Sequence, residues 1–155
     1  MLPPNATSNR QRIDSIIMQM DGAISSAEFR IQNVFSSHLV ILASGHVEIS
    51  VREIINRYVS QKSNLKINKF ITHTIERENS LNCEKIGRVL DKFDMNWRIE
   101  LAQIVLTSER ESINSLKTLR DQIAHGKQNS TGYITVKEYF KDSCKYLLKL
   151  NAIIV

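Results

Sequence analysis

Residues 37–61 read SHLVILASGHVEISVREIINRYVSQ, and this stretch decides the fold. Its apolar residues recur at the spacing of one face of an α-helix. The residues of this apolar stripe are Leu39, Leu42, Ala43, Val47, Val51, Ile54, Ile55 and Tyr58. The stretch contains no proline, so nothing in it demands a break in the helix. We therefore predict one long helix over roughly residues 37–61 with a continuous buried stripe.

The remainder of the chain is equally poor in residues that end helices. Both prolines lie in the first four residues, and glycine occurs only five times. Apolar periodicity predicts further helices over about residues 9–26 (extending as far as 35), 69–78, 84–93 and 97–106. Two capping-box patterns, Ser108 to Glu111 and Thr135 to Glu138, predict the starts of the last two helices, the first of which ends at Gly126.

The expected fold class is an all-α, up-and-down helical bundle. Two long early helices are followed by short middle helices and a closing antiparallel pair. Residues 1–8 are expected to be a flexible N-terminus, and residues 9–155 are expected to form a single helical domain.

Composition narrows the functional classes. The chain has 155 residues, 42% of them hydrophobic, which suits one domain with an ordinary core. The two cysteines, Cys83 and Cys144, form no CxxC pattern, so we expect a reducing, cytoplasmic location and neither metal nor cofactor. No signal peptide or long apolar run is visible, so no membrane partner is expected. The net charge of +5 favours a polyanionic partner such as nucleic acid.

The segment LRDQIAHGK, residues 119–127, carries the candidate chemistry. Arg120 follows Ile113 by seven residues, so it projects within about 20° of that inward direction. Asp121 and His125 are four residues apart, so they share an adjacent face, where the aspartate could orient the imidazole. An arginine for phosphate oxygens and a histidine for proton transfer suit RNA cleavage without metal. Spacing alone favours a structural interpretation, in which Arg120 pairs with a buried carboxylate and His125 caps the helix.

Three segments resemble a known family. LRDQIAHG, residues 119–126, is similar to the signature of the HEPN superfamily, in which an arginine is followed after four to six residues by a histidine. ILASGHVE, residues 41–48, with VREI at 51–54, resembles the second helix of the RiboL-PSP-HEPN branch. YITVKEY, residues 133–139, resembles the family's last loop and helix. The resemblance covers about residues 35–150.

This resemblance implies a four- or five-helix bundle that forms a homodimer, with the two motifs facing each other. It implies a metal-independent endoribonuclease, typically a toxin or defence effector, in which the 2′-hydroxyl of RNA attacks the adjacent phosphate. Arg120 would stabilise the phosphate charge, His125 would act as base or acid, and Asp121 would orient one of them. Glu48 would lie beside the motif; the alternative is a helix-surface pair with Arg52.

Partners follow from the same comparison. An antitoxin or other regulatory protein is a candidate partner, but Lys127 stands where relatives paired with nucleotidyltransferase antitoxins have a tyrosine. Lys127, Lys137 and Lys141 are expected to contact RNA phosphates, and Tyr133 to stack on a base. The alternative for the lysines, which continue to Lys145 and Lys149, is a solvated helix face.

Two other functions stay open from sequence. The chain could be a non-catalytic helical module that binds RNA or a protein, or a protein in which Arg120 and Glu48 form a purely structural pair. The other histidines, His38, His46 and His73, are expected at the surface.

Overall fold

The computed structural model describes residues 1–154, whose regular structure consists of helices alone. The seven helices are α1 (Pro4–Ile24), α2 (Phe29–Lys62), α3 (Leu65–Glu76), α4 (Cys83–Asp91), α5 (Met95–Ile104), α6 (Thr107–Ala124) and α7 (Tyr133–Ile154). The expected all-α bundle is confirmed. Two long helices come first, three short helices follow, and α6 and α7 close the bundle.

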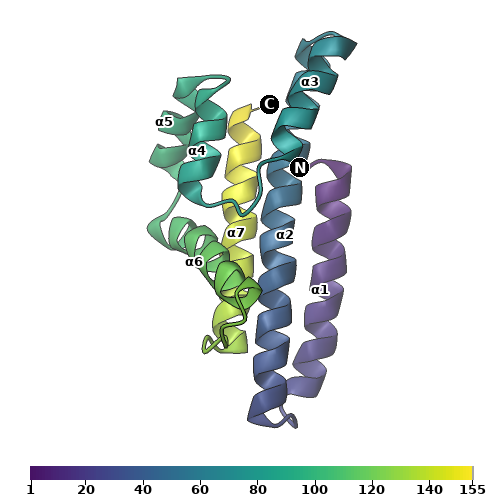
Figure 1. Cartoon of the computed structure of the whole chain (residues 1–155), viewed down its shortest axis with the longest axis vertical. Helices are drawn as coiled ribbons and strands as arrows, with labels where there is room; N and C mark the ends of the chain where they lie inside the picture. The colour runs from purple at the N-terminus through teal and green to yellow at the C-terminus, as the bar shows by residue number, and fades with distance from the viewer. Residues whose placement is uncertain (155) are drawn as a thin grey trace.

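Helix α2 is the central element of the bundle. It contacts α1, α3, α6 and α7, and it runs between α1 and α7 along the length of the molecule (Figure 1). Most of the predicted stripe is buried, from Leu39 through Val47 and Val51 to Ile55, while Tyr58 packs at its edge. By length and composition alone α2 could cross a membrane, but half of its apolar window is buried inside the bundle. Its apolar character therefore matches its place in the core.

The first two helices begin earlier than the periodicity indicated. Residues 4–8, expected to be flexible, form the first turns of α1, and Leu2 and Ala6 are buried. Pro4 suits this position because the backbone N–H groups in the first turn of a helix have no partner within the helix, so proline, which lacks an N–H, loses no hydrogen bond there. Helix α1 ends at Ile24, and α2 starts at Phe29 rather than near residue 37.

The start of α6 differs from the expected capping box. The N-cap is Leu106, and Glu109 accepts a hydrogen bond from its backbone N–H at 2.9 Å. The Glu109 side chain is buried and also pairs with Lys149 of α7 at 2.6 Å. The Glu109 carboxylate thus caps the start of α6 and at the same time binds α7. The Thr135 box is likewise misplaced, because α7 begins at Tyr133.

The segment that connects the short helices α3 and α4 lies against the long helix α2. Helix α3 packs on α2, while α4 and α5 pack together, and α5 also contacts α7. Residues 77–82 run from α3 to α4 (Figure 1). An Nη2 of Arg52 on α2 donates to the Glu78 carbonyl at 2.9 Å and to Asn79 Oδ1 at 2.6 Å, and Leu81 is buried. This segment is therefore held close to α2.

Candidate functional site

The candidate motif lies at a well-defined helix end. The Lys127 N–H donates to the Gln122 carbonyl at 2.9 Å, and the Gly126 N–H donates to the Ile123 carbonyl at 3.0 Å. This pair of bonds is a Schellman motif, and Gly126 at φ 74° occupies its left-handed position. The predicted helix end at Gly126 is confirmed. His125 is the C-cap residue and its side chain is exposed.

Arg120 lies at the edge of the core rather than inside it. Ile113 and Leu116 are each 1% exposed, as the predicted inward stripe requires, but the Arg120 side chain is 35% exposed. Among residues 1–154 its only carboxylate within ion-pair distance is Asp121, with Nη1 3.7 Å from Oδ1. That separation is longer than a hydrogen bond. The half-buried guanidinium is therefore held loosely.

Asp121 is held on both carboxylate oxygens, but not by His125. Lys117, four residues earlier on α6, lies 2.6 Å from Oδ2, and the Ser80 hydroxyl donates to Oδ1 at 2.7 Å. Lys117 first, and Ser80 second, lower the pKa of Asp121 below its ordinary value. The described side chains include no hydrogen bond or ion pair between Asp121 and His125, so Asp121 does not orient the imidazole here as expected.

Glu48 is joined to the motif through Ser80 instead of through Arg120. Its Oε1 accepts the Ser80 backbone N–H at 2.6 Å, and its Oε2 lies 3.8 Å from Arg52. No Glu48–Arg120 pair occurs within residues 1–154, so the purely structural pairing of those two residues is wrong. The Glu48–Arg52 helix pair exists and continues into the 77–82 segment.

The side chains joined around Asp121 and Glu48 form one polar cluster, which we call the Arg120 cluster. Its members are Glu48, Arg52, Ser80, Lys117, Arg120 and Asp121. Two of them, Lys117 and Ser80, were missed in the sequence analysis. Lys117 could have been found, because it stands four residues before Asp121 on the same helix face. Ser80 could not, because its role depends on a loop that meets two helices far away in sequence. With Arg52, Lys117 and Arg120 around two carboxylates, the cluster carries a positive excess.

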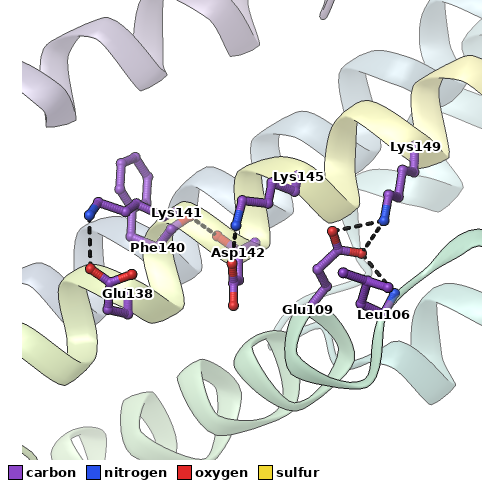
Figure 2. Close-up of polar contacts among 9 residues, drawn as sticks. Leu106, Glu109, Glu138, Phe140, Lys141, Asp142, Lys145 and Lys149 are labelled. Atoms are coloured by element: carbon purple, nitrogen blue, oxygen red, sulfur yellow. Dashed lines mark hydrogen bonds and ion pairs between the residues drawn. The ribbon is translucent and has the colours of Figure 1, made fainter.

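The basic stripe of α7 is largely neutralised. Lys141 pairs with Glu138 at 2.8 Å and Lys145 with Asp142 at 2.7 Å, while Lys149 reaches Glu109 (Figure 2). Lys137 pairs with Asp21 of α1. An RNA phosphate would therefore compete with a carboxylate for Lys137 and for Lys141, and their RNA contacts stay a prediction.

Tyr133 cannot stack on a base as expected. Its side chain is 4% exposed, and its hydroxyl donates to Asp21 Oδ1 at 3.0 Å. Burial raises the pKa of this phenol. The ring instead belongs to the core that joins α7 to α1.

An open groove lies beside the helix end. It has a volume of about 870 Å³ and runs between the first half of α2 and residues 123–129. Its apolar lining includes Val34 and Ile41, and its cations include Arg30 and Lys127. Ile41 precedes Glu48 by seven residues, so both lie on one face of α2, about 10 Å apart along the helix. Lys127 is the predicted RNA-binding residue that the structure leaves exposed beside the motif.

His46, expected at the surface, is wholly buried. Its Nδ1 lies 3.0 Å from Asn9 Oδ1, and its ring packs edge-on against Phe140 with centroids 5.7 Å apart. Its Nε2 has no hydrogen-bond partner among the described residues. His38 and His73 are exposed, as expected.

The arrangement can bind an anion and exchange a proton. Arg120 offers a loosely held guanidinium, and the exposed His125 offers an imidazole at the end of the same helix. Within residues 1–154 no group of three or more His, Cys, Asp or Glu side chains could hold a metal ion.

Comparison with known proteins gives one match. The family model described as RiboL-PSP-HEPN matches residues 7–155, which is nearly the whole chain. No curated protein and no solved structure compared with the chain matches it.

Proposed function

The chain belongs to the RiboL-PSP-HEPN family, and from this premise we propose that it is an endoribonuclease that cleaves RNA without a metal ion. The observation that carries the proposal is the loosely held Arg120 guanidinium, which shares a helix end with the exposed His125. A guanidinium fully paired with a buried carboxylate would be unavailable to a phosphate, and no carboxylate of residues 1–154 pairs with Arg120 in that way.

The proposed reaction uses the RNA as its own nucleophile. The 2′-hydroxyl attacks the adjacent phosphorus while the bond to the 5′-oxygen of the next nucleotide breaks. The products are a 2′,3′-cyclic phosphate and a 5′-hydroxyl, and the proton lost by the 2′-oxygen is balanced by one gained by the leaving oxygen. Arg120 stabilises charge on the non-bridging oxygens, and His125 either accepts the first proton or donates the second.

In an in-line displacement the attacking 2′-oxygen and the leaving 5′-oxygen lie on opposite sides of the phosphorus, so a single imidazole does not reach both, and one chain offers one exposed histidine at this helix end. We therefore propose a homodimer in which the motifs of both copies meet on one RNA strand. A cytoplasmic toxin or defence effector, restrained by an antitoxin or regulatory protein, is the biological role that we propose for this activity.

We place the RNA strand in the groove beside the motif. Arg30 and Lys127 would contact phosphates, and the apolar lining would contact bases. This surface replaces the α7 lysines and Tyr133 as the proposed RNA contact. It follows α2 towards Glu48 and so leads to the Arg120 cluster.

The test is cleavage of a mixed set of RNAs by the purified protein in EDTA. We expect Arg120→Ala and His125→Ala each to lower the rate at least 100-fold, because each removes charge stabilisation or proton transfer. The end of helix α3 offers a matched control, since His73 on that helix and Arg77 at its C-cap also form an exposed pair. Their alanine variants should cleave at the wild-type rate. Intact RNA with folded, dimeric wild-type protein, checked by light scattering, contradicts the proposal.

A second candidate is a non-catalytic module that binds RNA. It is favoured by one observation, namely that Asp121 binds Ser80 and Lys117, so that within residues 1–154 no carboxylate orients the His125 imidazole. RNA binding that is equally tight in wild type and His125→Ala, with no cleavage by either, would select this candidate.

A further inference from the structure

Ser80 occupies a backbone conformation that disfavours a serine. Its φ is 54°, the one positive value for a non-glycine residue within residues 1–154. A side chain at positive φ is strained, and such strain persists only where the surroundings impose it. Here they do, because Arg52 holds Glu78 and Asn79 on one side and Leu81 is buried on the other.

The strained conformation lets one residue contact two carboxylates. The Ser80 backbone N–H donates to Glu48 on α2 at 2.6 Å, and its hydroxyl donates to Asp121 on α6 at 2.7 Å. Glycine would adopt this backbone without strain and would keep the bond to Glu48. The hydroxyl is therefore the feature that requires a serine here.

The hydroxyl is one of two groups that hold the Asp121 carboxylate beside Arg120. Oδ1 of Asp121 accepts a hydrogen bond from the Ser80 hydroxyl, and Oδ2 pairs with the Lys117 ammonium, so the carboxylate is fixed from both sides. Fixed in this way, it lies 3.7 Å from the Arg120 guanidinium. Without the hydroxyl the carboxylate could rotate and form a direct charge-assisted hydrogen bond with Arg120.

We propose that Ser80 is a positioning residue, which holds the Asp121 carboxylate away from Arg120 and so keeps that guanidinium available to an RNA phosphate. The inference rests on the proposed function only in assigning Arg120 to phosphate. In this view Glu48 acts through Ser80, by fixing the loop that presents the hydroxyl.

The variant Ser80→Gly distinguishes a role of Ser80 in positioning Asp121 from a role in stabilising the fold. This variant relieves the strain at positive φ but loses the hydroxyl's bond to Asp121, so its Tm should stay close to that of wild type, whereas its RNA cleavage should fall about tenfold. Ser80→Ala keeps the Cβ and should show the same loss of cleavage. Ser25→Gly, at an exposed serine in the α1–α2 turn, controls for removal of a loop hydroxyl and should cleave normally. In an Asp121→Ala background, Ser80→Gly should cause no further loss.

A spectroscopic measurement keeps this test independent of activity. In ¹⁵N-labelled protein, with Arg120 assigned by its loss in Arg120→Lys, rotation about the Nε–Cζ bond should slow in Ser80→Gly as the guanidinium binds Asp121. Unchanged Arg120 signals in Ser80→Gly and Ser80→Ala would overturn the inference. Slowed rotation in both variants, together with a wild-type protein that cleaves no RNA, would support the positioning role while contradicting the nuclease.

Discussion

At the scale of single residues, the buried His46 makes stability depend on pH. Burial, and to a smaller extent the charge of Arg10, lowers its pKa from 6.5 to about 4. The unfolded chain therefore takes up the proton first as the pH falls. The part of the free energy of unfolding that depends on an uncharged His46 is fully present above about pH 6.5 and is lost as the pH falls towards 4.

We expect the free energy of unfolding to fall by about 3 kcal/mol across this window, which is the difference between the two pKa values expressed as energy. Urea unfolding between pH 7.5 and 4 measures it. His46→Leu, which removes the buried imidazole, should flatten the slope, whereas His38→Gln at an exposed position should preserve it. An equal slope in wild type and His46→Leu would assign the pH dependence to other groups.

At the scale of elements, local sequence patterns predict a helix boundary correctly where that boundary depends only on residues at the helix end. Gly126 ends α6 as predicted, because the left-handed C′ position is a property of that helix end alone. Tyr133 and Lys137 could not be placed from sequence, because Asp21 on α1, which binds both, lies more than 100 residues away. His46 is likewise buried by a distant element, α1, through Asn9. Periodicity predicts which face of a helix is apolar, but the partner of a polar side chain depends on the tertiary fold.

The start of α6 gives a prediction at the same scale. Glu109 accepts the Leu106 N–H and pairs with Lys149, so its removal should both uncap α6 and break one ion pair between α6 and α7. We expect Glu109→Ala to lower the free energy of unfolding by about 2 kcal/mol. Thermal unfolding should show this as a fall in Tm of about 4–8 °C. The exposed Glu111 is the matched control, and its alanine variant should lie within about 0.5 kcal/mol of wild type. Equal effects of the two would mean that the shared carboxylate does not join the helices.

At the scale of the whole molecule, the basic residues behind the net charge of +5 differ in whether a carboxylate already pairs with them. Lysines 137, 141, 145 and 149 on α7 each have a carboxylate partner, whereas Arg30 and Lys127 line the groove beside the motif. A cation that stays paired with its carboxylate neutralises no RNA phosphate, and counterions are released only where phosphates are neutralised. The distribution of partners, rather than the number of basic residues, should therefore decide where RNA binds.

This predicts a salt dependence that differs between two sets of basic residues. The slope of log Kd against log salt should decrease by about one for each RNA phosphate that the protein no longer neutralises, so Lys127→Gln and Arg30→Gln should each reduce it by roughly one. Lys145→Gln removes the same charge from a paired, exposed position and should leave the slope unchanged. Binding is best measured on an RNA with a 2′-deoxy cleavage site, which prevents turnover. If Lys145→Gln reduced the slope as much as Lys127→Gln, the RNA would follow α7, and the groove would not be its path.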